Sequence, residues 1–341
     1  MTWSRRALLA AAAVLATRPA RAQSPKPREE EPLILRAHRK GLIYGAAVPA
    51  AALANPIFGD ILADECGLIA TQDEADWAAL QPQPGRFDFT AVDRLAGFAQ
   101  RRNLLFRPRS LLRHTALPDW MAEAVTPALA GRTLAEHIGP VTARYRGRVH
   151  SWDIVGEAIE PANGRSDGLR VTPWLRSMGP RYIDVAFRLA RTIDRDALLA
   201  YSESGLDAAT PEHDARRRAV LGLLEWLRGR GVPVGALAIE SRLESDAPFE
   251  APAFRGFLHE VAGMGLRIVI AGLDVHGGRV ERASERLGRY VETALDERAV
   301  VAVISAGLAT PGSYGRPLDD DLNRTPVWAS LARAFDAAPS R

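Results

Sequence analysis

Glu157 is the residue of this sequence best placed for acid–base chemistry. The apolar pair Ile154 and Val155 leads through Gly156 to Glu157, and a polar loop follows. This pattern predicts a buried strand that delivers one carboxylate to an open site, which is where barrel enzymes hold their reactive groups. A carboxylic acid in such a place can protonate a leaving group or take a proton from water.

A second strand, at residues 267–275, is expected to face Glu157 across the site. Gly272 stands in it two positions before Asp274. Because side chains alternate along a strand, both positions point to the same face. The expected site therefore has a glutamate on one strand and only a glycine on the other.

The elements that must position these residues recur regularly. Apolar runs of strand length occur at 43–48, 67–70, 104–106, 149–155, 197–201, 236–239, 267–270 and 300–304. Segments with apolar residues three or four apart lie at 89–99, 133–146, 181–194, 212–229, 252–264, 281–296 and 325–336. Apolar strands that alternate with helices indicate a parallel sheet. We therefore predict an α/β fold, a single (β/α)8 TIM barrel. A doubly wound sheet is the alternative, but no Gly-rich phosphate loop supports it.

Residues 1–22 predict a twin-arginine export signal. Arg5 and Arg6 precede a short apolar run, and Ala20-Arg21-Ala22 offers a cleavage site. A disordered basic tail or a short membrane anchor is the alternative, although a span needs roughly 20 apolar residues. We expect a periplasmic or secreted protein with a polar lead-in of little fixed structure at 23–40, and the barrel at 41–341.

The charge balance argues against nucleic acid as a partner. The formal net charge of +3 becomes −1 without residues 1–22, which hold four arginines and no acid. Cys66 is the single cysteine, so no intrachain disulfide can form. The seven histidines show no metal-ligand spacing, and we expect neither a metal site nor a cofactor. We expect a monomer with no membrane span in the mature chain.

Five stretches together resemble glycoside hydrolase family 10, the retaining β-1,4-xylanases. Trp77 also matches a family tryptophan just before the first of them. The stretches are Pro-Gly-Arg-Phe-Asp-Phe at 84–89, His-Thr-Ala-Leu-Pro-Asp-Trp at 114–120, Trp-Asp-Ile-Val-Gly-Glu-Ala-Ile at 152–159, Ile-Ala-Gly-Leu-Asp-Val at 270–275, and Arg-Pro-Leu with Pro-Val-Trp within 316–328. Their order supports the barrel from about residue 41 to 338.

The resemblance implies that Glu157 is the general acid/base and that the family's nucleophilic glutamate falls on Gly272. A retaining glycosidase needs two carboxyl groups about 5–5.5 Å apart, so the standard mechanism is not supported. Neighbouring positions depart from the family as well. Gly156 replaces an asparagine, Glu240 a glutamine, Arg242 the histidine that positions the nucleophile, and Ile304 a tryptophan.

The resemblance also implies a set of substrate-binding positions. They are Asp73, Asp76, Trp77, Arg109, Arg113, His114, Glu203, Glu240, Arg242 and Asp274. We expect Arg242 to reach the space above Gly272 and to form a buried pair with Asp274 or Glu240. Arg109 and Arg113 favour planar anions such as a uronate carboxylate. Trp77 is expected to lie partly in the core and partly under a sugar, and His114 either in the site or in a purely structural loop.

Three functions follow. The first is an exported xylanase-like hydrolase that acts on or binds a β-1,4-linked polysaccharide, with catalysis reduced, altered or lost. Water could attack with help from Glu240 or Asp274, or Glu240 could replace the nucleophile, with Glu203 a weaker candidate; a misplacement near 1 Å reduces the rate on the order of 100-fold. The second is a non-catalytic binding protein for an acidic polysaccharide, and the third is a structural partner in polysaccharide assembly.

Overall fold

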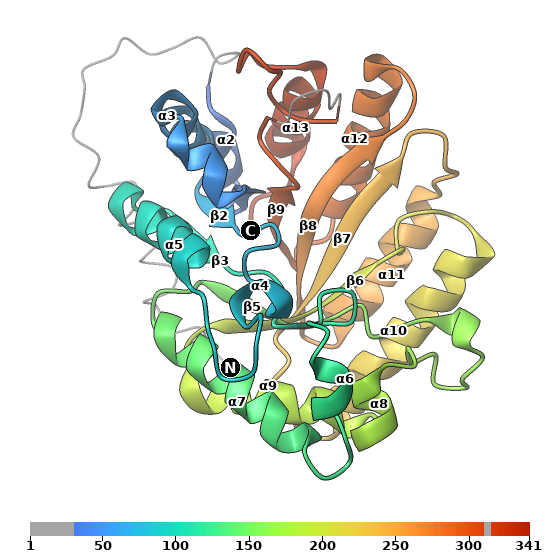
Figure 1. The fold of residues 1–341 in the computed structure, drawn as a ribbon. Coiled ribbons are helices and arrows are strands. Elements are labelled where there is room, and N and C mark those ends of the chain that lie inside the picture. The colour runs from blue at the N-terminus through green and yellow to red at the C-terminus, as the bar shows by residue number, and fades with distance from the viewer. Residues whose placement is uncertain (1–30, 310–314) are drawn as a thin grey trace.

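A closed ring of parallel strands surrounded by helices makes up the protein in this computed structural model, which describes residues 31–309 and 315–341 (Figure 1). The strand order is β3-β2-β1-β9-β8-β7-β6-β5-β4. The strands are β1 Ile43–Ala47, β2 Leu68–Ala70, β3 Leu105–Arg107, β4 Leu112–Arg113, β5 Ser151–Gly156, β6 Leu198–Ser204, β7 Ala236–Glu244, β8 Arg267–His276 and β9 Val300–Ser305. All eight predicted strands are present.

Strands β3 and β4 together occupy one position of the ring. β3 pairs with β2, and β4 pairs with β5. The backbone N–H of Leu111, just before β4, donates to the Asp153 carbonyl of β5 at 2.8 Å, and the backbone N–H of His150, just before β5, donates to the Phe106 carbonyl of β3 at 2.9 Å. The second of these bonds joins the β3 edge to the other side of the sheet and closes the ring, which confirms the predicted (β/α)8 barrel.

The seven predicted helical segments are confirmed. They form α5 Thr90–Arg102, α7 Ala130–Tyr145, α9 Arg181–Ile193, α10 Pro211–Gly229, α11 Ala251–Gly263, α12 Val280–Leu295 and α13 Pro326–Ala337. The sequence patterns did not single out α3 Pro56–Glu65, α4 Trp77–Leu80, α6 Met121–Ala124, α8 Pro173–Met178 and the 3-10 helices η2 Ala50–Ala54 and η3 Pro161–Asn163. Asn55 caps α3 by accepting hydrogen bonds from the backbone of Ile57 and Phe58.

The expectation of little fixed structure at 23–40 is wrong for residues 33–39, which form helix α2 (Leu33–Arg39). Leu33 and Ala37 have no exposed surface, and Arg36 forms an ion pair with Asp336 of α13. The buried apolar side of α2 therefore stabilises this helix. The charged residues of the segment hid the helical pattern in the sequence. The predicted export signal and residues 23–30 lie outside the described residues.

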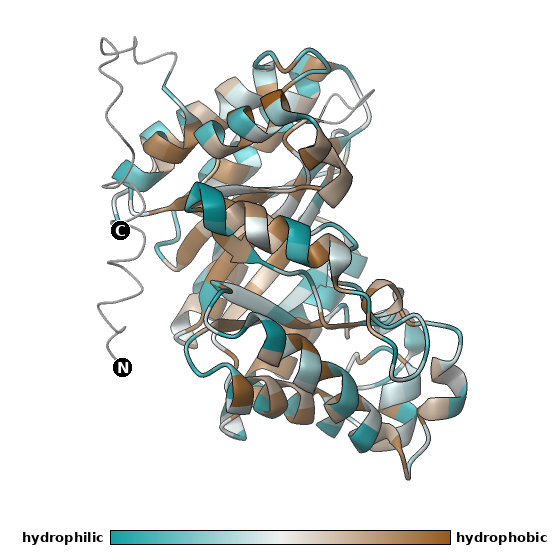
Figure 2. Cartoon of the chain, turned by 60° about the vertical axis from the view of Figure 1, so that its left-hand side comes forward, coloured by the Kyte–Doolittle hydropathy of each residue, from teal (hydrophilic) through white to brown (hydrophobic). Residues whose placement is uncertain are grey.

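Two apolar layers fill the fold. Small residues occupy the inside of the ring, where Ala47, Ala200, Ala238, Ala271 and Ala302 are buried. Larger side chains fill the space between ring and helices, and the helices in Figure 2 are correspondingly part hydrophobic and part hydrophilic. No helix in the described ranges is long and apolar enough to cross a membrane. Because side chains fill the inside of the ring, a site built on the strands can open only at the mouth of the ring.

Candidate active site

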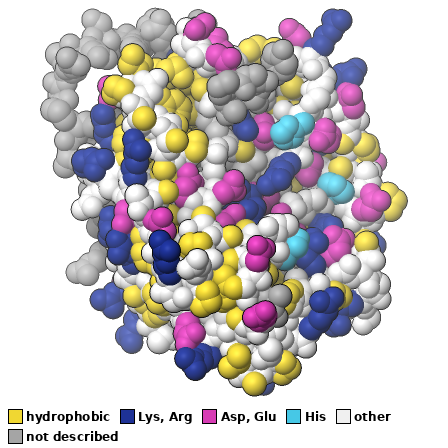
Figure 3. All heavy atoms as spheres, in the orientation of Figure 1, with side chains coloured by type: hydrophobic (Ala, Val, Ile, Leu, Met, Phe, Trp, Pro, Cys, Tyr) yellow, Lys and Arg dark blue, Asp and Glu magenta, His cyan; other side chains and the backbone are white. Residues whose placement is uncertain are grey.

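A cavity of about 260 Å³ opens where the strands end. Charged and histidine side chains line it, namely Asp73, Arg107, Arg109, Asp153, Glu240, Arg242, Asp274, His276 and Arg316. In the space-filling view, acidic, basic and histidine side chains gather around the middle of this face (Figure 3). The ring thus presents a polar mouth above an apolar interior.

Glu157 stands at this mouth, directly after β5, as the sequence predicted. Its backbone N–H donates to the Ser202 carbonyl at 2.9 Å, and its φ of 55° is left-handed. A non-glycine residue in that region is strained, and such strain occurs often at functional sites. The Ser204 hydroxyl donates to Glu157 Oε1 at 3.3 Å, and 14% of the Glu157 side chain is exposed. Its carboxyl group is therefore held in place and remains accessible.

His114 lies beside Glu157 and belongs to the site. Its Nδ1 is 3.7 Å from Glu157 Oε2, which is too long for a hydrogen bond. Burial lowers the pKa of His114, and Arg170 lowers it further, while Glu157 opposes the shift. A neutral imidazole at this position can orient a ligand without forming an ion pair with the acid.

Glu240 fills the space above Gly272. A Cβ atom built on Gly272 would lie 2.6 Å from Glu240 Oε2. Gly272 has a φ of 54°, and the register between β8 and β9 shifts between Ile270 and Leu273. Arg109 Nη2 donates to Glu240 Oε2 at 2.8 Å. The β7 carboxylate, rather than Arg242, therefore lies where a side chain of residue 272 would begin.

The expected buried pair between Arg242 and Asp274 is wrong. Asp274 Oδ2 lies 2.9 Å from Arg316 Nη2 and 3.2 Å from His276 Nε2. Arg242 is exposed, and no ion pair joins it to an acid of the described ranges. Strands β7 and β8 run past the rim, and their register shifts between Glu240 and Arg242, so this side chain lies in the open mouth.

Comparison with known proteins identifies the family. A sequence model of glycosyl hydrolase family 10 matches residues 33–317. The chain belongs to glycosyl hydrolase family 10. Endo-1,4-beta-xylanase A of Caldicellulosiruptor sp. (strain Rt8B.4) is 29% identical over 235 residues, which are 66% of this chain but only 33% of that protein. Endo-1,4-beta-xylanase B of Thermotoga neapolitana is 26% identical over 290 residues, which are 80% of this chain and 81% of that protein.

Solved xylanase structures share the fold. Xylanase 10B from Thermotoga petrophila RKU-1, solved in complex with xylobiose, has a TM-score of 0.82 at 23% identity and covers 89% of this chain and 97% of its own. Native xylanase 10B from Thermotoga maritima has the same TM-score, 0.82, at 23% identity. At this level of identity the likeness shows the family 10 barrel and leaves the chemistry to be argued from the residues.

The arginines predicted to bind an anionic sugar already have acidic partners. Arg113 Nη2 lies 2.6 Å from Asp76 Oδ2 and 3.5 Å from Asp73 Oδ1. Arg109 pairs with Glu240, and its Nη1 is 4.0 Å from Asp73. Burial raises the pKa of Asp76 to about 6, although Arg113 opposes the shift. Asp73, with 78% of its side chain exposed, stands at the rim of the mouth, while Asp76 is buried beneath it.

The expectation that Trp77 lies partly under a sugar is wrong. Only 1% of it is exposed, and its ring stacks on His137 at a centroid distance of 3.8 Å and on Trp174 at 5.4 Å. Its indole N–H donates to Gln81 at 3.1 Å. Both faces and the polar edge are therefore occupied, and Trp77 belongs to the core of this family 10 barrel.

The prediction that Glu203 contacts substrate is also wrong. Glu203 is fully buried on the outer face of β6, where it accepts hydrogen bonds from the Tyr201 hydroxyl and from the Ile159 backbone at 3.1 Å. Burial raises its pKa to about 7. Its neighbours Ser202 and Ser204 point to the inside instead, because side chains alternate along the strand. Glu203 therefore holds the loop after Glu157 in place from the outer side of the ring.

Two arginines of the mouth, Arg107 and Arg316, were not among the site residues predicted from the sequence. Arg107 forms a buried ion pair with Asp153, whose pKa burial raises to about 6. Arg316 comes from the loop after β9 and holds Asp274. Arg107 directly follows the apolar run 104–106, and a charged residue at the end of a barrel strand was the signal available for it. Nothing local in the sequence indicates the contact of Arg316.

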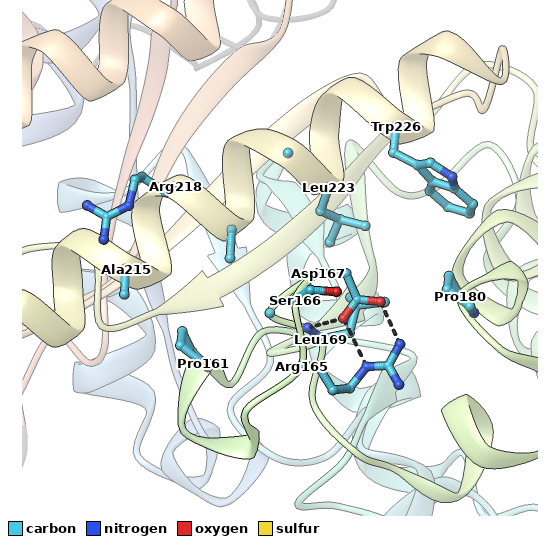
Figure 4. A pocket seen from close by; sticks show the side chains of 13 residues that line it. Pro161, Arg165, Ser166, Asp167, Leu169, Pro180, Ala215, Arg218, Leu223 and Trp226 are labelled. Atoms are coloured by element: carbon cyan, nitrogen blue, oxygen red, sulfur yellow. Dashed lines mark hydrogen bonds and ion pairs between the residues drawn. The ribbon is translucent and has the colours of Figure 1, made fainter.

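A larger cavity, of about 520 Å³, lies outside the ring between the loop at 161–169 and helix α10 (Figure 4). Leu223 and Trp226 contribute its apolar part. Asp167 is its single acid, and both its oxygens are bound by Arg165, at 2.9 and 2.6 Å. The mouth, rather than this cavity, therefore holds the groups suited to acid–base chemistry. No cluster of three potential metal ligands occurs among the residues described.

Proposed function

We propose that this family 10 protein hydrolyses a β-1,4-linked, xylan-like polysaccharide at the mouth of the barrel, with Glu157 as general acid/base. The observation that carries the proposal is the placement of Glu157 at the end of β5, on strained backbone and beside His114 and Ser204. The xylanases to which the chain is similar act on this class of polymer, as their names state.

Glu157 has the contacts that a proton donor needs. Ser204 binds one carboxyl oxygen, and the other faces the half-buried imidazole of His114. Arg170 Nε donates to the Glu157 carbonyl at 2.8 Å and fixes the backbone as well. An acid held in this way can protonate the glycosidic oxygen as the bond to the anomeric carbon breaks.

The test compares xylan hydrolysis by the wild type, Glu157→Ala and Glu285→Ala. Glu285 is an exposed acid on α12, so its removal controls for the loss of a surface charge. Loss of a general acid lowers rates roughly 100- to 10,000-fold. We expect a decrease of this size for Glu157→Ala alone, measured as release of reducing ends. Equal rates in all three proteins would contradict the proposal.

A second candidate function is non-catalytic binding of an acidic polysaccharide. The observation in its favour is Arg242, an exposed guanidinium at the mouth with no acidic partner in the described ranges. It replaces Arg109 and Arg113 as the candidate for a uronate carboxylate, since those two side chains already have partners.

Calorimetry distinguishes the two candidates. Binding of glucuronoxylan that weakens with salt and with Arg242→Ala, together with no hydrolysis that depends on Glu157, would favour the binding protein. Equal affinity for unsubstituted xylan and glucuronoxylan would exclude a role for the acidic group.

Export through the twin-arginine pathway is proposed from residues 1–22 alone. Replacing Arg5 and Arg6 by lysine is expected to keep the full-length precursor inside the cell, whereas the wild type reaches the periplasm or the medium in a shortened form. Immunoblotting of cell fractions measures this difference. An unchanged distribution would contradict the proposal.

A further inference from the structure

We propose that Glu240 on β7 is the nucleophile of this protein, so that the carboxylate absent from β8 at Gly272 is supplied by the neighbouring strand. This inference rests on the proposed hydrolysis. It specifies a residue that the family resemblance assigns to a glutamine rather than to the nucleophile.

The first argument is space. Glu240 Oε2 lies 2.6 Å from the position of a Cβ atom on Gly272, and Oε1 lies 4.0 Å from it. A side chain at 272 could not enter without moving Glu240. The absence of a side chain on β8 and the carboxylate on β7 are therefore two parts of one arrangement.

The second argument is the division of labour between the two carboxylate oxygens. Oε2 accepts the hydrogen bond from Arg109 Nη2 at 2.8 Å, and Glu240 as a whole is 5% exposed. Oε1 accepts no hydrogen bond from the residues described here, and Glu240 lines the mouth cavity. Arg109 thus orients the group by one oxygen, while the other remains available for a substrate.

The third argument is the position relative to Glu157. Strand β6 separates the two acids, and its last residue, Ser204, lies between them. The Ser204 hydroxyl donates to Glu157, and the Ser204 Cα pairs in register with that of Glu240. The two carboxylates therefore stand at one level of the ring, on strands that flank the same residue.

The other acids of the mouth are committed elsewhere. Asp153 forms a buried ion pair with Arg107. Asp274 forms an ion pair with Arg316 and accepts a hydrogen bond from the backbone N–H of Val275. Asp73 lies at the exposed rim. Glu240 is the acid of the lining whose second oxygen is uncommitted beside the position of the family's nucleophile.

The chemistry balances over two displacements. Glu240 Oε1 attacks the anomeric carbon, the glycosidic C–O bond breaks, and Glu157 gives its proton to the departing oxygen. Water then attacks the same carbon and loses a proton to Glu157, and the bond to Glu240 breaks to restore both carboxyl groups. The product keeps its anomeric configuration.

A fluorosugar identifies the nucleophile directly. 2,4-Dinitrophenyl 2-deoxy-2-fluoro-β-xylobioside slows the second displacement and leaves the sugar on the protein, and peptide mass spectrometry then locates it. We expect one fluoroxylobiosyl group on Glu240 in the wild type and none in Glu240→Gln. An adduct on any other residue, or no adduct at all, would overturn the inference.

The same reagent separates this inference from the proposed function. Dinitrophenolate leaves without protonation, so labelling of Glu157→Ala is expected to reach the same site. Failure of Glu157→Ala to slow xylan hydrolysis would count against the function, whereas failure of the label to appear on Glu240 counts against the inference.

A swap variant controls for folding. Gly272→Glu combined with Glu240→Gln returns the carboxylate to β8, and we expect it to regain labelling, now at residue 272, that Glu240→Gln lacks. Melting temperatures of all variants, followed by circular dichroism, show whether each is folded. If the wild type is labelled on Glu240 and the swap variant is folded but unlabelled, Glu240 is still the nucleophile. A carboxylate on β8 then cannot replace the one on β7. An adduct at 272 in the swap with none on Glu240 in the wild type would overturn it.

Discussion

Glu157 and Glu203 stand at the ends of adjacent strands, yet they lie on opposite sides of the ring. Glu157 faces the mouth with 14% of its side chain exposed, while Glu203 is sealed behind β6 and bonded to the backbone of Ile159. Glu157 can contact a substrate, whereas Glu203 holds the loop that follows Glu157. Two glutamates that the family resemblance places in the site thus divide between the mouth and a supporting layer behind it.

Trp77 gives the largest test of the supporting layer. Trp77→Ala removes a buried ring stacked on His137 and Trp174, and loss of a large aromatic side chain from a core lowers the free energy of unfolding by about 3 to 5 kcal/mol. Urea unfolding measures this change. Because Trp77 does not reach the mouth, KM for xylan is expected to stay within about twofold at temperatures where the variant is folded. A large rise in KM with unchanged stability would return Trp77 to the substrate groove.

Two arginines of the mouth, Arg316 and Arg242, are expected to differ in how much they contribute to stability. Arg316→Met leaves the buried Asp274 without its closest ion-pair partner, and loss of such a partner from a buried charged group lowers stability by about 1 to 3 kcal/mol. Arg242→Met removes an exposed charge and is expected to change stability by less than about 0.5 kcal/mol. Thermal unfolding of the two variants side by side provides the measurement. Equal losses would indicate that Arg242 has a partner after all.

The remaining test changes pH instead of a contact, and it concerns Glu203. Burial raises the pKa of Glu203 from its ordinary 4.5 to about 7, so the folded state binds this proton more tightly than the unfolded state. This contribution to stability is complete below pH 4.5 and is lost as the pH rises through 7. Glutamine cannot ionise, so the melting temperature of Glu203→Gln is expected to rise relative to that of the wild type between pH 4.5 and 7.5. A constant difference over this range would show that Glu203 titrates normally.

The fold was predictable because the barrel repeats one pattern. Eight apolar runs and seven periodic helices specified it, and the placement of Glu157 followed from its position after β5. Helix α2 was missed because Arg36, His38 and Arg39 mask its apolar side, which becomes visible only against α13.

The details of the mouth could not be predicted by strand alternation alone. The irregular pairing around Gly272 and between Glu240 and Arg242 shifts the register there, which places Arg242 in the open and Glu240 above the glycine. The partner of Asp274 comes from the loop after β9, roughly 40 residues along the chain, and no local pattern encodes that contact.

Because the backbone at Glu157 is left-handed, the residue that would make the protein most heat-stable at this position differs from the residue that the proposed reaction needs. Glycine adopts this conformation without the steric penalty of a Cβ atom, which amounts to about 1 to 2 kcal/mol. A library screened only for survival on heating would therefore enrich glycine at position 157, and every such survivor would lack the carboxyl group that we propose as the proton donor.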